Sequence, residues 1–194
     1  MERYIILRIL LGLFLLFAAI FLIIRLASSD GPSDPERSVV AEDAFVLAEQ
    51  DNAASKVVFT IVGKINASED HREVRFTINQ ETRLVEILGG YDGKVIKSTK
   101  LSNTNNSYRE FLEAINNAGY TTVRKEPKVS DPRGVCSNGK QYLYDAFVDN
   151  EVKSSLWSTS CNSYGTSRAN RASVRSLFER QFPEYRDFIR GTKL

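Results

Sequence analysis

The chain has little of what most catalytic and metal-binding sites are built from. Its 194 residues include one histidine, His71, and two cysteines, Cys136 and Cys161. These cannot complete a structural zinc site, which takes four Cys or His ligands, and a histidine-based triad would have to use His71. The phosphate-binding glycine loop, the G-x-S-x-G elbow and the D-x-D-x-D-G calcium loop are also missing from the sequence. We therefore expect no cofactor or metal, and the sequence favours a non-enzymatic protein without assignable catalytic residues.

An excess of charge of one sign is absent as well. The chain has 26 basic and 24 acidic residues. Removing Arg3, Arg8, Arg25 and Glu2 leaves 23 of each from Ala27 onward. A dedicated nucleic-acid binder usually has a strongly basic body. Nucleic acid is therefore not an expected partner of the domain as a whole.

One long apolar run is present near the start of the chain. Residues 5–24 read IILRILLGLFLLFAAIFLII and contain a single charge, Arg8. Twenty helical residues cover roughly 30 Å, the thickness of a bilayer's hydrocarbon core. Arg8 lies one turn inside the start, where its long side chain can reach the headgroups. We predict that residues 1–26 are a short cytoplasmic stub and a transmembrane signal-anchor helix whose partner is the lipid bilayer.

A cleaved signal peptide is the alternative interpretation of this run. Against it, the run is longer than the usual h-region of about 7–15 residues, and Arg25 occupies a position where a cleavage site needs a small residue. Arg3 and Arg8 mark the cytoplasmic end, whereas the polar stretch at residues 27–43 contains Asp30, Asp34 and Glu36 in its first part. We therefore predict a single-pass protein of the cell membrane, with an extended linker over 27–43 and an extracytoplasmic C-terminal domain.

Residues 44–194 are predicted to form one α+β domain. Alternating apolar residues, such as Val74, Phe76 and Ile78, are typical of half-buried antiparallel strands. An S-x-x-E capping box at Ser107 predicts a helix that ends at Gly119. A short helical turn is expected over 43–50, strands over 56–65, 73–78, 82–88, 94–101, 141–149 and 152–160, and a second helix over 171–182 with a final turn through 189. The result is a small antiparallel sheet packed with two helices in the order β-β-β-β-α-β-β-α.

The last two predicted strands form a hairpin that brings the cysteines together. A turn at Asn150 and Glu151 sets a register in which Cys161 lies opposite Lys140. A short turn before Lys140 can then fold Cys136 back onto the open end of the hairpin. Exported domains commonly oxidise such pairs, so we predict a Cys136–Cys161 disulfide. Two free, buried thiols are the alternative.

Two groups of residues are candidates for binding a partner. In the predicted register Tyr142, Tyr144 and Trp157 share one face of the hairpin, where they could stack on a sugar or anchor a protein. The alternative is a core face packed under a helix. Arg171 and Arg175, together with Arg168, have helical spacing and could meet an anionic lipid, glycan or DNA. The alternative is a solvated helix face on which Arg175 pairs with the glutamate four residues later.

Several stretches also resemble a known group of proteins. They are HREVRFTI (71–78), SYREFLEAINNAGYT (107–121), RGVCSNGKQYLYDAF (133–147), LWSTSC (156–161) and SLFERQFPEY (176–185). They are similar to uncharacterised, single-pass, membrane-anchored extracytoplasmic domain proteins of candidate-phylum, ultrasmall bacteria. The resemblance implies the anchored plan and the disulfide, and it implies no activity.

Taken together, these features predict a membrane-tethered extracytoplasmic interaction or structural module of the cell envelope. Its partner would be an envelope protein or a glycan. One alternative is an envelope enzyme whose carboxylates are brought together by the fold. Another is capture of an anionic polymer, DNA or glycan, by the basic C-terminal helix that contains Arg171 and Arg175.

Overall fold

The computed structural model describes residues 46–51, 54–127, 129–161 and 165–194. The predicted membrane helix and the linker at 27–43 lie outside these residues. Within the described ranges, none of the helices combines the length and the apolar character needed to span a bilayer.

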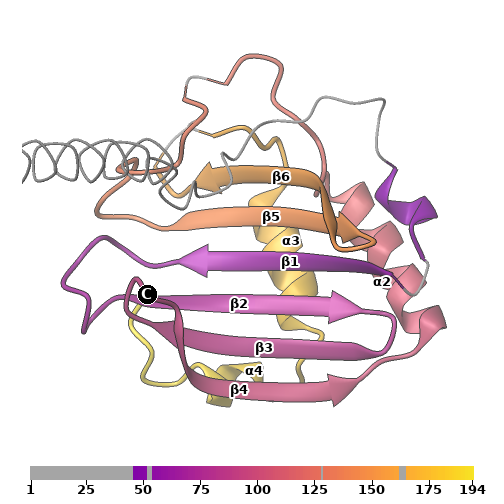
Figure 1. The fold of residues 1–194 in the computed structure, drawn as a ribbon, viewed down its shortest axis with the longest axis horizontal. Helices are drawn as coiled ribbons and strands as arrows, with labels where there is room; N and C mark the ends of the chain where they lie inside the picture. The colour runs from indigo at the N-terminus through magenta and orange to yellow at the C-terminus, as the bar shows by residue number, and fades with distance from the viewer. Residues whose placement is uncertain (1–45, 52–53, 128, 162–164) are drawn as a thin grey trace, which may run out of the picture. The chain divides into compact units, whose positions relative to one another are not determined.

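The described part of the chain is built on a six-stranded antiparallel sheet in the order β4-β3-β2-β1-β5-β6 (Figure 1). This confirms the predicted α+β class. The strands are β1 Ser55–Val62, β2 Arg72–Asn79, β3 Thr82–Gly89, β4 Lys94–Ser102, β5 Gln141–Val148 and β6 Glu151–Thr159. The helices are the 3₁₀ turn η1 Leu47–Glu49, α2 Asn105–Asn117, α3 Arg171–Glu179 and α4 Tyr185–Phe188. The element order differs from the predicted β-β-β-β-α-β-β-α in two added elements, η1 before β1 and the separate helix α4 after α3, which fall where helical turns were expected over 43–50 and through 189.

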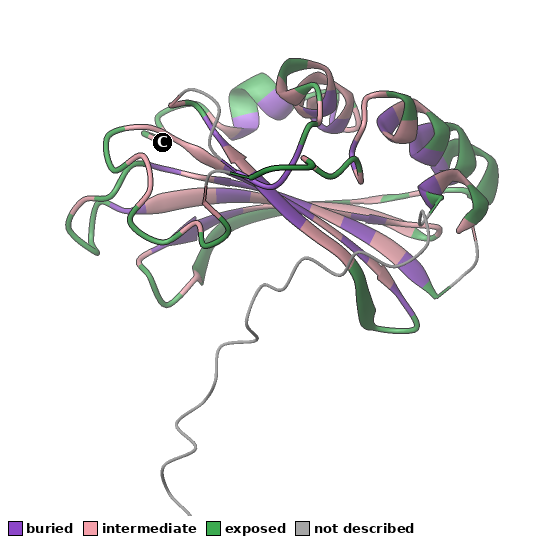
Figure 2. Ribbon diagram, turned by 90° about the horizontal axis from the view of Figure 1, so that it is seen from above, coloured by how far each residue is buried: buried purple, intermediate pink, exposed green. Residues whose placement is uncertain are grey.

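The helices gather over one face of the sheet, and the core lies between the two layers (Figure 2). Alternation along each strand sends every second side chain into this layer, as Val57, Phe59 and Ile61 of β1 show with exposures of 1%, 0% and 1%. Phe178 of α3 is fully buried at the centre. Its ring centroid lies 5.0 Å from that of Phe59. Burial of this aromatic layer is therefore the main source of the domain's stability.

The hairpin of β5 and β6 has a different register from the predicted one. Its turn residues are Asp149 and Asn150, with φ values of 53° and 64°, so Val148 pairs with Glu151. Positive φ at both central residues is the type I′ geometry, whose twist matches that of the flanking strands. The predicted turn at Asn150 and Glu151 was therefore wrong by one residue. A bulge between Phe147 and Ala146 also leaves Lys153 of β6 without a partner, so the pairing beyond it differs from the predicted register by one residue, which moves side chains to the opposite face of the sheet.

The start of α2 also differs from the prediction. The N-cap is Thr104, whose side-chain oxygen accepts a hydrogen bond from the Ser107 backbone N–H at 3.3 Å. The capping box predicted at Ser107 and Glu110 is wrong, because the helix already begins at Asn105 and both residues lie inside it. Both Thr104 and Ser107 have cap-forming side chains, and the chain enters the helix at the first of them.

The predicted end of α2 at Gly119 is confirmed. Gly119 has a φ of +78° and follows the C-cap residue Ala118. The Gly119 N–H donates to the Asn116 carbonyl at 2.8 Å, and the Tyr120 N–H donates to the Ile115 carbonyl at 3.0 Å. This pair of bonds is a Schellman motif, in which a residue without Cβ adopts the left-handed conformation at little cost.

The cap assignment gives the first testable prediction. Replacing Thr104 with alanine removes the acceptor for the Ser107 N–H and is expected to lower the free energy of unfolding by about 1 kcal/mol. Ser107→Ala is the matched control, because it keeps the backbone donor and the Thr104 acceptor, and a smaller loss is expected. Urea unfolding followed by circular dichroism measures both. A larger loss for Ser107→Ala would place the cap at Ser107 instead.

Candidate functional site

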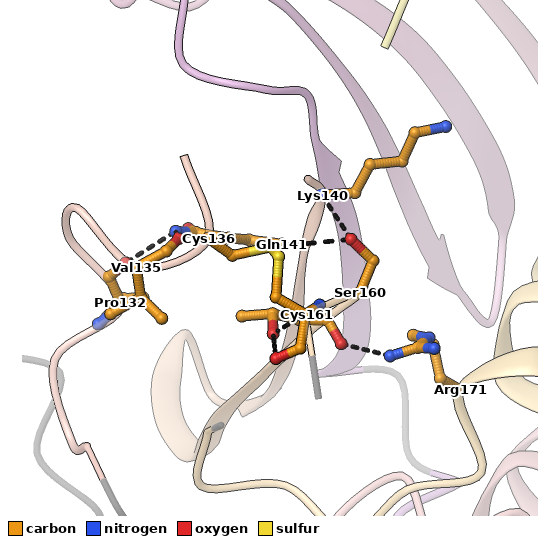
Figure 3. The surroundings of a disulfide bond; sticks show 9 residues. Pro132, Val135, Cys136, Lys140, Gln141, Ser160, Cys161 and Arg171 are labelled. Carbon is orange, nitrogen blue, oxygen red and sulfur yellow. Dashed lines mark hydrogen bonds between the residues drawn. A yellow bond between two sulfur atoms is a disulfide. The ribbon is translucent and has the colours of Figure 1, made fainter. Parts of the chain in front are cut away.

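The disulfide lies at the open end of the β5–β6 hairpin (Figure 3). Cys136 and Cys161 are bonded, with their Cα atoms 5.7 Å apart and 25 positions apart in sequence. The Lys140 N–H donates to the Ser160 side-chain oxygen at 2.8 Å, and the Ser160 N–H donates to the Lys140 carbonyl at 2.9 Å. The predicted disulfide is confirmed. Because the register is shifted by one residue, Ser160 takes the place opposite Lys140 that was predicted for Cys161.

The segment before Cys136 is held against β5 by one side chain. The Gln141 amide nitrogen donates to the carbonyls of Pro132 at 2.6 Å and Val135 at 2.8 Å (Figure 3). These bonds satisfy two backbone acceptors that no strand pairs with. Gln141 and the disulfide together fix the loop around Cys136 at this end of the sheet.

A pocket of about 250 Å³ opens beside this loop, and His71 lies at its inner side. The His71 side chain is 1% exposed, and its ring stacks on Tyr91 with centroids 4.1 Å apart. Its Nε2 lies 3.3 Å from a Glu73 carboxylate oxygen and its Nδ1 lies 3.3 Å from the Lys64 carbonyl. His71 therefore joins the β1–β2 loop to the turn between β3 and β4, which is a structural role.

The three aromatic residues predicted to form one strip do not share a face. Tyr144 lies opposite Leu156, whereas Trp157 lies opposite Leu143, so Trp157 points to the other side of the sheet. Tyr142, Tyr144 and Trp157 are 5%, 0% and 1% exposed. The prediction of a shared face is therefore wrong, and its physical cause is the β-bulge at Lys153, which shifts the rest of β6 by one residue relative to β5.

Each of these side chains has a place in the core. Tyr144 packs on Phe59 with ring centroids 5.3 Å apart under the helices, and burial raises its pKa to about 12. Tyr142 also stacks on Phe59, with centroids 6.2 Å apart. On the other face, the Trp157 indole N–H donates to the Ser130 carbonyl at 2.7 Å. The alternative interpretation, a core face packed under a helix, therefore holds for Tyr142 and Tyr144.

The two candidate arginines of α3 have partners inside the domain. Arg171 donates to the Thr159 carbonyl, and its guanidinium carbon lies 5.2 Å from the centroid of the Tyr142 ring. The Arg175 Nε lies 2.7 Å from a Glu179 oxygen, four residues along the helix. This is the pair expected for a solvated helix face. Arg168, before the helix, is exposed.

The structure contains a groove that sequence reasoning missed. It has a volume of about 420 Å³ and lies between β4 and the C-terminal segment. The apolar part of its lining comes from Val85, Leu101, Phe182, Tyr185 and Phe188. Tyr185 and Phe188 lie on the short helix α4 after Pro183, and Phe182 directly precedes that proline. The spacing of these three residues was a signal that could have indicated a shared face. Their partners on β3 and β4 are far away in the sequence, so the groove itself could not be read from it.

Carboxylates are present at the rim of this groove. Glu184 and Asp187 line it, both are exposed, and Asp187 pairs with Arg190. In the part of the chain that the structure describes, no group of three or more His, Cys, Asp or Glu side chains is arranged to hold a metal ion. The groove is thus an apolar depression with a charged rim, which suits binding of a side chain.

The comparisons with known proteins do not assign the chain to a family. No protein-family model matches this chain, and no match was found among curated proteins.

Proposed function

We propose that this chain is a membrane-tethered, extracytoplasmic interaction or structural module of the cell envelope. The observation that carries the proposal is the Cys136–Cys161 disulfide. Such bonds persist in oxidising compartments and are rare in the cytosol. The apolar run at 5–24 supplies the tether, and the acidic residues that follow it favour export of the C-terminal part.

The arrangement of the domain supports interaction as its role. Helices cover one face of the sheet, and the edge strand β4 is exposed along most of its length beside an apolar groove. Grooves and free strand edges are surfaces on which folded modules bind peptides. Capture of an anionic polymer is less favoured, because Arg171 and Arg175 already contact Tyr142 and Glu179.

Extraction of membranes tests the tether. The full chain is expected to stay in the membrane fraction after an alkaline carbonate wash. The matched variant Leu15→Arg/Leu16→Arg places two charges at the centre of the apolar run, each costing about 3 kcal/mol there, and is expected in the soluble fraction. Immunoblots of the two fractions give the readout.

A different outcome would contradict the proposal. Recovery of the unaltered protein in the soluble fraction, with its first residue near Ser28 by mass spectrometry, would mean that the apolar run is a cleaved signal peptide. Retention of the double-arginine variant in the membrane would mean that another part of the chain holds the protein there.

A further inference from the structure

The two edges of the sheet differ in how they are covered. At the β6 edge, the Ser167 N–H donates to the Trp157 carbonyl at 2.9 Å, and the Trp157 N–H donates to the Thr166 side chain at 3.1 Å. At the β4 edge, no hydrogen bond from the described residues reaches the outer side of the strand between Lys94 and Leu101. β4 therefore presents a free row of backbone donors and acceptors.

The pairing pattern shows which groups point outward. The Gly90 N–H donates to the His71 carbonyl, so the even-numbered residues at the end of β3 face β2 and the odd-numbered residues face β4. Val85 is odd and lies opposite Thr99. The N–H and carbonyl of Thr99 thus face β3, and those of its neighbours Ser98 and Lys100 face outward.

A bulge leaves Ile96 of β4 without a partner on β3, and from Lys97 to Leu101 the side chains of β4 alternate between the groove and the other face. Lys97, Thr99 and Leu101 line the groove, and Lys97 is held there because its Nζ donates to the Phe188 carbonyl at 2.9 Å. A strand added outside β4 would send every second side chain toward the groove. The apolar lining from Phe182 and Phe188 would favour apolar side chains at these positions.

The charges of β4 select the partner. The strand carries Lys94, Lys97 and Lys100 and no acidic residue. Two copies of β4 side by side would bring like charges together, which is destabilising, whereas a carboxylate beside Lys100, on the face away from the groove, is attracted. Lysines on an edge strand thus oppose self-association and leave pairing with an acidic segment open.

Apolar exposure is also concentrated near this edge. Val95 and Ile96 of β4 are 50% and 54% exposed, and Tyr91 in the preceding turn is 56% exposed. Partial burial of these side chains by a bound segment would add to the backbone hydrogen bonds of an added strand.

We propose that β4 binds, by strand addition, an extended segment of a partner protein in which acidic and apolar residues alternate. The apolar side chains face the groove beside Leu101 and Phe188, and the acidic ones lie on the opposite face near Lys100. This assignment rests on the proposed role as an interaction module and names the chemistry of its partner.

A labelled peptide tests the assignment. The probe is the nine-residue peptide Glu-Val-Glu-Phe-Glu-Val-Glu-Leu-Glu, which matches the length of β4, and the full chain in detergent is titrated while fluorescence anisotropy is recorded. Saturable binding is expected, with a peptide carrying Lys in place of Glu binding at least about tenfold more weakly. Equal binding of the two peptides would overturn the assignment.

Backbone variants locate the site. Ser98→Pro removes an outward N–H while keeping the bonds to β3, so the affinity for the acidic peptide is expected to fall at least about tenfold, whereas Ser98→Thr keeps it. Lys100→Glu is expected to weaken binding of the acidic peptide and to strengthen binding of the lysine peptide. This second variant tests the assignment even if Ser98→Pro does not fold. Full affinity in both Ser98→Pro and Lys100→Glu would overturn the assignment.

Two further outcomes separate the alternatives. A dimer in solution that Ser98→Pro converts to monomer would assign the edge to a second copy of the chain and overturn the assignment to a partner. The peptide test does not depend on the membrane. Loss of the tether with peptide binding intact would therefore contradict only the proposed tether, and a tethered chain that does not bind the peptide would contradict only the strand addition.

Discussion

Replacing Phe178 with alanine is expected to lower the free energy of unfolding by about 3–5 kcal/mol. The ring is 0% exposed and is the point where helix α3 meets the sheet. Its centroid lies 5.0 Å from Phe59, 5.8 Å from Phe76, 5.0 Å from Phe111 and 5.7 Å from Tyr120. Truncation removes contacts with the sheet and with α2 at once and leaves a cavity that these rings cannot fill.

Phe178→Leu is the matched control because it keeps much of the volume. A loss well below that of the alanine variant is expected, since only the aromatic contacts and part of the packing are removed. Urea unfolding of both variants, monitored by near-UV and far-UV circular dichroism, gives the two free energies. An alanine variant within about 1 kcal/mol of the unaltered protein would mean that α3 does not close the core.

Removing the disulfide is expected to cost about 3–4 kcal/mol of unfolding free energy. Cys136 and Cys161 are 25 positions apart, and closing a loop of that length restricts the unfolded chain. The measurement compares the oxidised protein, the same protein reduced, and the variant Cys136→Ser/Cys161→Ser in chemical denaturation.

The reduced protein and the double serine variant are expected to unfold at the same lower denaturant concentration. That agreement would assign the loss to the cross-link and not to the new side chains. If the oxidised and reduced proteins unfold at the same concentration, the disulfide does not stabilise the folded domain.

The strands could be predicted from sequence because each buries one face through local alternation. Val74, Phe76 and Ile78 are all 0% exposed, as their spacing indicates. Alternation defines which residues of one strand share a face and does not define the register between two strands. The register of β5 and β6 depends on which two residues adopt positive φ, and Asp149, Asn150 and their neighbours offered more than one choice. It also depends on the bulge at Lys153, which no alternation in the sequence indicates.

The packing around Trp157 and the groove beside β4 could not be predicted from sequence, because each is formed by segments that are far apart in the chain. Trp157 is buried partly through Ser130, 27 positions away, and the groove brings β4 beside a helix more than 80 residues later. The disulfide could be predicted despite the wrong register, because a shift of one residue still leaves Cys136 and Cys161 at the same open end of the hairpin.

The proposed extracytoplasmic location of the C-terminal domain is tested most directly by its accessibility to protease from outside the inner membrane. The full chain carries an epitope tag after Leu194, and protease is added to cells whose inner membrane is intact and whose outer layers are permeable. We predict loss of the tag signal while a cytoplasmic marker protein survives. A tag that is protected until the inner membrane is lysed would place the domain in the cytoplasm and contradict the proposal.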